Sequence, residues 1–328
     1  MRNGPHASRL TATGPAPILG PVSAPPEGPV AATPAAGARP AGRAPQIVRA
    51  MVWMAVGGFM LCAMNGVMRI MTQQLDPLQS QFLRYVFGLL VMLPWVLRAG
   101  LRSYWPNNMI GQWARGVAHT AALALFFLAL PHIPLADVTA IGFVTPIFVL
   151  VGAAIVLREK VSPARWLAAG VGFGGVLIVV APHLSGHGAG WWSLVMLAAS
   201  PLFAASFLIN KALTRRDTPE TIVFWQNVSV MLLTLPLALP GWRDPTLVQW
   251  GTFLLCGVLG TLAHLCMTRA FSLGDISAMQ PVRFLDLIWA ALLGIALFGD
   301  MPSASALLGG AVIVASTMWI ARREAARR

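Results

Sequence analysis

Residues 69–84 read RIMTQQLDPLQSQFLR, and residues 211–226 read KALTRRDTPETIVFWQ. Lys211 and Pro219 in the second stretch stand 142 positions after Arg69 and Pro77 in the first. An offset of 141 positions relates three further matches: Ala129-Leu130 to Ala270-Phe271, Phe143 to Phe284, and Glu159 to Asp300. The chain therefore contains an internal sequence repeat.

Long apolar runs separate the few charged residues. Of the 328 residues, 57% are hydrophobic and only 10% are charged, which is not the composition of a soluble globular domain. Each copy contains about five runs close to the roughly 20 residues that cross a bilayer as a helix. The expected spans are 49–70, 77–97, 110–130, 135–156, 164–182, 190–211, 219–240, 247–270, 276–298 and 303–321. The prediction is an all-α integral membrane protein with ten transmembrane helices.

An odd number of spans in each copy makes the second copy enter the membrane the opposite way up. We therefore expect two inverted five-helix repeats, at 49–182 and 189–321. Inverted repeats are typical of secondary transporters, whose substrate site lies between the halves near the midplane.

Lysine and arginine are distributed very unevenly over the predicted loops. With the N-terminus in the cytoplasm, 18 of the 23 basic residues fall on the cytoplasmic side and only Arg69 and Arg243 fall on the other. This asymmetry places both termini in the cytoplasm. The net charge of +12 is confined to segment ends and forms no continuous basic face, so no nucleic-acid partner is expected.

The two ends of the chain differ from the apolar body. Residues 1–48 are rich in Pro, Ala and Arg, and such a segment buries too little apolar surface to order itself. We expect a disordered cytoplasmic tail there, with translation from near Met51 as an alternative, and a short basic cytoplasmic tail at 322–328.

Several motifs together resemble the drug/metabolite transporter superfamily, in particular its EamA-type branch, over residues 49–321. The motifs are Asn65-Gly66, Pro77 with Arg84, Arg115-Gly116, Ala129-Leu130, Ile133-Pro134-Leu135-Ala136, Phe143 with Pro146, and Arg158-Glu159-Lys160-Val161. The stretch 281–300 is similar to the ninth helix of a subgroup associated with S-adenosylmethionine or riboflavin uptake. The resemblance implies ten helices, two inverted repeats and alternating access. The chain departs from the family pattern at Arg158, Gln226 and Asp300.

Ionisable side chains inside a span are costly, roughly 2.5–3.5 kcal/mol at a helix centre, and normally face a cavity or a partner. Arg283 and Asp286 are three residues apart in the ninth predicted span and share a helix face with Gln280 and Trp289. This face fits a substrate site, in which Arg283 meets an anionic group and Asp286 a cation or a proton. It equally fits an internal ion pair that cancels both charges.

The other polar residues within predicted spans extend the candidate substrate site. Arg115 and His119 are four residues apart and share a face, and a buried histidine is one candidate for proton coupling. Structural pairing and interhelical hydrogen bonding are alternatives for every one of these residues. The additional candidates are Arg84, Arg115, His119, Asn65 and Gln226.

These patterns favour a secondary active transporter that moves a small polar metabolite, anionic or zwitterionic, across a bacterial inner membrane. The chain has no Walker-type phosphate loop, and we expect no cofactor and no bound metal. Lipid and the small-molecule substrate are the expected partners. Gly170 and Gly174 form a small-xxx-small pair, which fits packing within the chain or a homodimer contact. An integral-membrane enzyme and a passive channel are the alternatives, and the sequence contains neither a hydrolase motif nor a repeated pore-lining ring.

Overall fold

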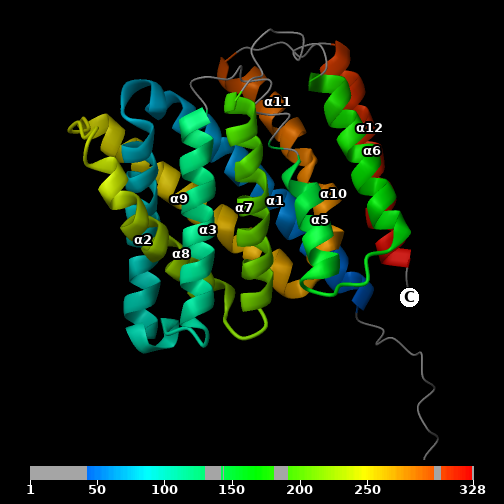
Figure 1. The fold of residues 1–328 in the computed structure, drawn as a ribbon, viewed down its shortest axis with the longest axis horizontal. Helices are drawn as coiled ribbons and strands as arrows, with labels where there is room; N and C mark the ends of the chain where they lie inside the picture. Colours follow the sequence, from blue (N-terminus) through cyan, green and yellow to red (C-terminus); the bar gives the residue numbers. More distant parts are fainter. Residues whose placement is uncertain (1–42, 130–141, 143, 181–190, 299–303, 327–328) are drawn as a thin grey trace, which may run out of the picture. The chain divides into compact units, whose positions relative to one another are not determined.

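A computed structural model describes residues 43–129, 142, 144–180, 191–298 and 304–326 of the chain, all of which belong to one compact unit, Pro40–Arg328. The described residues contain helices and no strand (Figure 1). The elements are α1 (Arg43–Gln74), α2 (Pro77–Ala99), the 3₁₀ helix η1 (Leu101–Tyr104), α3 (Met109–Ala129), α5 (Thr145–Ile155), α6 (Pro163–Val180), α7 (Trp191–Leu213), α8 (Pro219–Ala238), α9 (Leu247–Leu273), α10 (Ile276–Arg283), α11 (Leu285–Phe298) and α12 (Ala304–Ala326).

The repeated prolines of the sequence begin corresponding helices. Pro77 is the first residue of α2, and the Asp76 carboxylate caps that helix by accepting from the N–H groups of Leu78 and Gln79. Pro219 is the first residue of α8, with Thr218 as the cap. Proline suits this position because its missing N–H has no helical partner there and its φ is already helical.

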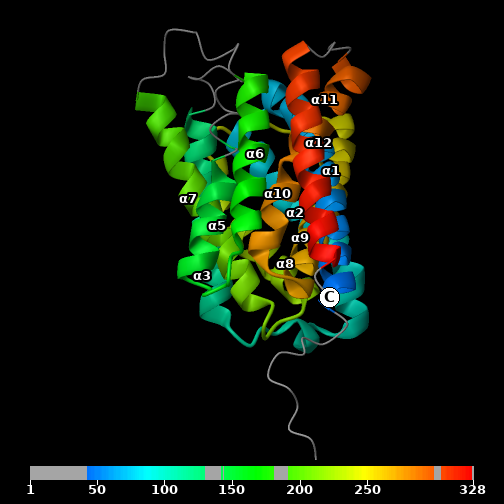
Figure 2. The ribbon, with the colours of Figure 1, turned by 90° about the vertical axis from the view of Figure 1, so that its right-hand side faces the viewer.

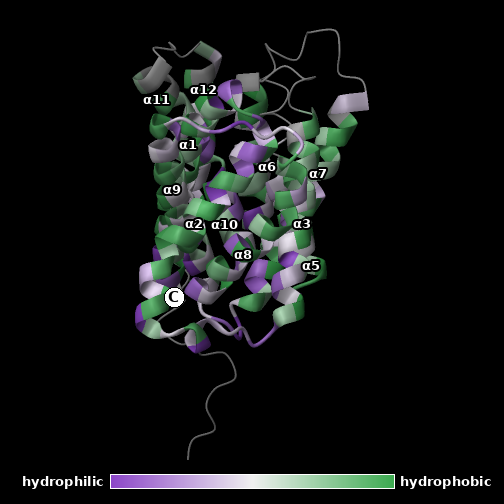
Figure 3. Ribbon diagram, turned by 90° about the vertical axis from the view of Figure 1, so that its left-hand side faces the viewer, coloured by the Kyte–Doolittle hydropathy of each residue, from purple (hydrophilic) through white to green (hydrophobic). Residues whose placement is uncertain are grey.

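The expected all-helical fold is confirmed among the described residues, and six helical segments are long and apolar enough to cross a membrane. These segments are 46–74, 77–99, 194–213, 219–238, 247–273 and 276–293, and the shorter apolar helices are 145–155 and 163–178. Figure 3 shows apolar ribbon along most of the helices and hydrophilic ribbon gathered at the end where the C-terminus lies. The number of ten spans stays a prediction. Leu130, Phe143 and Asp300, named in the repeat, and residues 1–42 of the expected tail lie outside the described residues.

Two boundaries differ from the sequence-based expectation. α1 begins at Arg43 rather than near residue 49. The ninth span, expected as one helix over 276–298, is interrupted at Phe284 between α10 and α11. Pro281 precedes the interruption, and a proline inside a helix removes one backbone donor and crowds the preceding turn.

Neighbouring helices pair in a way that joins distant parts of the sequence. α1 packs along α9, α3 along α7, and α2 along both α8 and α9. α6 and α12 lie side by side at the edge of the bundle (Figure 2). Between them, Gly175 faces Ile313 and the Gly309 carbonyl so closely that an added Cβ would clash. These pairings leave α10 and the polar parts of α2, α3, α8 and α9 inside the bundle.

The small-residue pair of α6 makes no close contact with the part of the chain that the structure describes, unlike the packing that one of the two sequence-based alternatives expects. A Cβ atom added at Gly170 or Gly174 would meet no described atom within 4 Å. The glycines that permit close contact are Gly172, which faces Phe284, and Gly175. Gly170 and Gly174 therefore lie on one face of the helix, and Gly172 and Gly175 lie on another.

Candidate functional site

A polar cluster lies inside the bundle where helices of both sequence repeats meet. We call it the arginine–histidine cluster. Its members come from α2, α3, α7, α8 and α9 and are Arg84, Tyr85, Arg115, His119, Ser206, Gln226, Asn227, Thr261 and His264. Four of the residues predicted from sequence, Arg84, Arg115, His119 and Gln226, therefore lie in one place.

Arg115 is the most deeply buried arginine of the cluster, with a side chain only 1% exposed. Its guanidinium crosses from α3 to α8, where it donates to the carbonyl of Ile222 at 3.1 Å and to the side-chain oxygen of Gln226. Gln226 continues to α9, because its Nε2 lies 3.4 Å from Nε2 of His264. These contacts tie three helices together through polar side chains.

Arg84 on α2 has weaker partners than Arg115. One terminal nitrogen lies 2.9 Å from the thioether sulfur of Met64, and the guanidinium sits 4.3 Å above the ring centre of Tyr85. Its Nε has no hydrogen-bond partner among the described residues. A thioether is a weak acceptor, so the hydrogen-bonding capacity of this buried guanidinium is largely unused.

Two histidines stand between the arginines. Nε2 of His119 is 3.0 Å from the hydroxyl of Tyr85, and its Nδ1 is 3.4 Å from the hydroxyl of Ser206. The rings of His119 and His264 are 5.8 Å apart and nearly perpendicular. Each half of the bundle thus contributes one histidine to the cluster.

A narrow hollow opens beside Arg84 within this cluster. It is lined by Arg84, Tyr85, Asn227, Gly257, Gly260, Thr261 and His264, and it is too tight to hold a water molecule in this conformation. Gly257 allows α9 to approach α2, because a Cβ there would overlap the backbone of Phe87. The hollow places Arg84 of the first repeat opposite polar side chains of the second.

The electrostatics of the cluster are one-sided. Among the described residues neither Arg84 nor Arg115 forms an ion pair. Both are buried, and an uncompensated charge in such surroundings is strongly unfavourable. The arrangement favours an anionic group in the bundle interior.

The second group of predicted residues lies at the break between α10 and α11. A terminal nitrogen of Arg283 is 3.6 Å from a carboxylate oxygen of Asp286, and the guanidinium lies 4.7 Å from the ring centre of Phe207. Asp286 packs against Gly58 of α1, and the thiol of Cys62 donates to the Asp286 carbonyl at 3.3 Å. Arg283 and Asp286 are therefore an ion pair, as one of the two sequence-based alternatives expects.

Three polar atoms around this pair have no partner among the described residues. They are Nη1 of Arg283, the indole Nε1 of Trp289 and the side-chain oxygen of Gln280. Buried polar atoms are normally hydrogen-bonded. The pair of charges thus lies among two unused donors and one unused acceptor, which suits a ligand with groups of both kinds.

Asn65 is the predicted residue that the structure leaves apart. It is exposed on α1, and no hydrogen bond to either group is recorded for it among the described residues. His264, Tyr85 and Thr261 belong to the cluster although sequence reasoning did not place them in the substrate site. Repeat spacing offers a signal for two of them, since His119 and Thr261, like Tyr85 and Asn227, stand 142 positions apart. No such match marks His264.

A helical bundle with six apolar segments long enough to cross a membrane and with arginines in its interior is typical of a polytopic membrane protein. The model of the EamA-like transporter family matches this chain twice, at residues 48–181 and at 190–322. The chain belongs to the EamA-like transporter family, within the drug/metabolite transporter superfamily. The resemblance drawn from its motifs is confirmed, and the two matches agree with the internal repeat.

Curated relatives with different named substrates are similar over most of the chain. A riboflavin transporter of Rhizobium johnstonii is 32% identical over 84% of this chain and 92% of its own length. An S-adenosylmethionine uptake transporter of Rickettsia bellii is 27% identical over 82% of this chain and 94% of its own. A pseudopaline exporter of Pseudomonas aeruginosa is 27% identical over 85% of this chain and 98% of its own length.

A solved crystal structure shares the fold. It covers 87% of this chain with a TM-score of 0.73 at 15% sequence identity. The comparisons therefore support membrane transport of small metabolites. They assign neither the metabolite nor the direction, because the names of the relatives differ in both.

Proposed function

We propose that the chain is a secondary active transporter of a small anionic or zwitterionic metabolite, driven by a proton or substrate gradient. In this proposal ten spans form two inverted five-helix repeats, 49–182 and 189–321, which rock against one another to give alternating access. Both termini lie in the cytoplasm of a bacterial cell, with the chain in its inner membrane. Lipid covers the exposed apolar faces, and the Gly170–Gly174 face is a candidate contact for a second copy of the chain.

The observation that carries the substrate class is the pair of buried arginines, Arg84 and Arg115, for which the described residues supply no acidic partner. In the proposal Arg84 and Arg115 attract the anionic group, because a carboxylate or phosphate supplies the missing counter-charge. Arg283 and Asp286 cancel one another and leave a net positive interior. The site is assigned to Arg84, Arg115, His119, Gln226, Gln280, Arg283, Asp286 and Trp289.

Counterflow in proteoliposomes tests this proposal. Vesicles are loaded in turn with unlabelled riboflavin, S-adenosylmethionine, amino acids, nucleotides and organic acids. The same solute in labelled form is added outside, and its accumulation inside the vesicles is followed. Saturable accumulation of an anion or zwitterion supports the carrier. Linear, non-saturating flux indicates a channel, and chemical conversion of the solute, checked by chromatography, indicates an enzyme.

Arg84→Gln is the sharpest variant for the site. Its main contacts are a thioether and a ring face, so folding is expected to survive, while the half-saturating concentration rises about tenfold to a hundredfold from the loss of a charge-assisted bond. Arg98→Gln is the matched control, because Arg98 is exposed at the end of the same helix. Equal affinity in the two variants contradicts the assignment of Arg84.

A further inference from the structure

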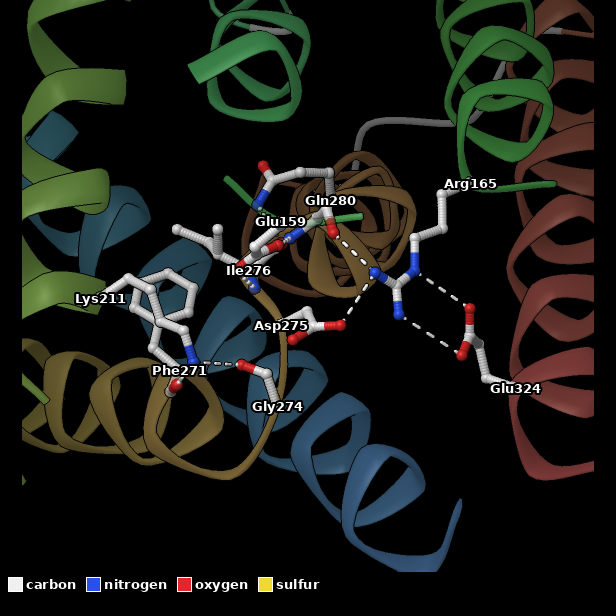
Figure 4. Close-up of polar contacts among 10 residues, drawn as sticks. Glu159, Arg165, Lys211, Phe271, Gly274, Asp275, Ile276, Gln280 and Glu324 are labelled. Carbon is white, nitrogen blue, oxygen red and sulfur yellow. Dashed lines mark hydrogen bonds and ion pairs between the residues drawn. The ribbon is translucent and has the colours of Figure 1, made fainter. Parts of the chain in front are cut away.

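The short turn between α9 and α10 is held by side chains from four other parts of the chain. Figure 4 shows Glu159, which follows α5, Arg165 of α6, Lys211 of α7 and Glu324 of α12 arranged around residues 271–277. Basic residues surround this end of the bundle, and we call it the basic end: Arg158, Lys160, Arg215, Arg216, Arg322 and Arg323. By the distribution of lysine and arginine it is the cytoplasmic end.

Two of these side chains satisfy the helix ends that meet at the turn. The Glu159 carboxylate accepts from the N–H groups of Ile276 and Ser277 at 3.0 and 3.1 Å. The Lys211 ammonium donates to the carbonyls of Phe271 and Gly274. A negative group at a helix N-terminus and a positive one at a C-terminus are both favourable. These contacts hold the turn together as a unit.

Arg165 connects that unit to the outer helices. Its Nη1 donates to the Asp275 carboxylate at 3.0 Å and to the Ser277 hydroxyl at 2.8 Å, while its Nε donates to Glu324 at 3.0 Å. The side chains of Arg165 and Glu324 are only 4% and 2% exposed, whereas that of Asp275 is 52% exposed. Ser277 is buried as well, and the Asp275 carboxylate is the member of this network that reaches solvent.

The sequence repeat separates the shared contacts from those found at one end alone. Glu159 and Lys211 have repeat counterparts in Asp300 and Arg69. The positions that correspond to Arg165, Asp275 and Ser277 carry side chains unable to form such bonds, namely Ala306, Pro134 and Ala136. The sequence therefore repeats the residue types of Glu159 and Lys211, whereas the residue types that bond to Arg165 occur in one repeat position only.

We propose that the contacts of Arg165 with Asp275 and Ser277 form a latch that closes the transport path at the basic end. The inference rests on the proposed function. Opening releases Asp275 and Ser277 from Arg165, while Arg165 keeps its buried partner Glu324 and never becomes an unpaired buried charge. The Asp275 carboxylate is half exposed, so water solvates it once it is released. The latch therefore opens without loss of the α6–α12 pairing.

The accessibility of Cys62 tests the latch without any substrate. This cysteine is partly buried beside Asp286 at the middle of the bundle. The full-length protein is prepared with Cys256→Ala and Cys266→Ala, so that a membrane-impermeant maleimide reports on Cys62 alone. Labelling rates are measured in inside-out and right-side-out vesicles, which expose opposite ends of the bundle.

Asp275→Asn and, separately, Ser277→Ala are expected to raise the labelling rate about two- to fivefold from the basic end, and to leave it unchanged from the other. The matched control is Asp244→Asn, since Asp244 is an exposed aspartate in the loop before α9 that accepts one hydrogen bond from Trp242. Unchanged rates in both latch variants, or an equal rise from both sides, overturn the proposal. Because labelling needs no transported solute, a failed transport assay leaves this result readable.

Discussion

Gly58 of α1 lies directly against the Asp286 carboxylate of α11, so closely that a Cβ atom added at Gly58 would overlap one of its oxygens. Because Gly58 has no side chain, the Asp286 carboxylate of α11 can lie against the backbone of α1. This contact lies beside the ion pair of Asp286 with Arg283, whose nearest atoms are 3.6 Å apart.

Gly58→Ala is therefore expected to displace Asp286 and to lower the transport rate at least about tenfold, while overpacking costs about 1–3 kcal/mol of stability. Counterflow and thermal unfolding of the purified protein measure the two effects. Gly251→Ala provides the control, since Gly251 is exposed on α9 and a Cβ there meets no described atom within 4 Å. Equal behaviour of the two alanine variants argues against a role for the Gly58–Asp286 contact.

Pro281 is expected to maintain the break between α10 and α11. Pro281→Ala restores a backbone donor, straightens the segment and moves Asp286 relative to Arg283, so transport falls about tenfold or more while thermal stability is maintained or rises. Pro94→Ala serves as the comparison, because Pro94 is an exposed proline inside α2. Wild-type transport in Pro281→Ala shows that the break is not needed.

Asp217 joins the segment before α3 to the turn before α8. Its carboxylate accepts from the backbone N–H of Asn107 at 2.7 Å, from the Asn107 amide at 3.0 Å and from Gln112 at 2.9 Å. Asp217→Ala leaves the buried Gln112 amide without this acceptor and is expected to destabilise the protein by about 1–3 kcal/mol. The Asn107 amide keeps the Arg216 carbonyl as an acceptor. Thermal unfolding in detergent measures this loss.

The control for Asp217 is Asp244→Ala, which removes a single exposed bond to Trp242 and costs well under the same amount. A similar unfolding temperature for the two variants contradicts the structural role of Asp217.

Gln79 and Arg243 are joined at the end of the bundle opposite the latch. The Gln79 amide donates to the Arg243 carbonyl and accepts from the Arg243 N–H at 3.0 Å, so the bond uses the backbone of Arg243 and not its side chain. Gln79→Leu is expected to destabilise the protein by about 1–3 kcal/mol, and Arg243→Ala is expected to leave the unfolding temperature close to wild type. The reverse order in a thermal-shift measurement contradicts this geometry.

The spacing of polar residues in the sequence predicted which charged side chains are buried. It did not predict which side chains they contact. Arg84, Arg115, His119 and Gln226 were expected in one cavity, and the structure brings them together because α2, α3 and α8 pack side by side. Asn65 has the same polar character within an apolar run, yet it lies on the exposed side of α1. A helix turns 100° for each residue, and the composition of a run does not say which face meets a neighbouring helix.

Glu159 shows the same limit at a helix end. It directly follows an expected span, but the helix that it caps begins more than a hundred residues later in the chain. Arg165 lies at the start of the expected span 164–182, and that position indicates no partner. Its bonds to Asp275, Ser277 and Glu324 join α6 to parts of the chain that are distant in sequence.

The sequence by itself determined the class of protein, because a span must be apolar along its whole length and positive loops stay on one side of a membrane. It also determined that the pattern occurs twice, since matching residues recur at a constant offset. Only the tertiary structure decided that Arg283 pairs with Asp286, that Arg84 and Arg115 lack acidic partners among the described residues, and that Gly58 positions Asp286. Such relations depend on how helices rotate and pack against one another, and packing is a property of surfaces that meet from distant parts of the chain.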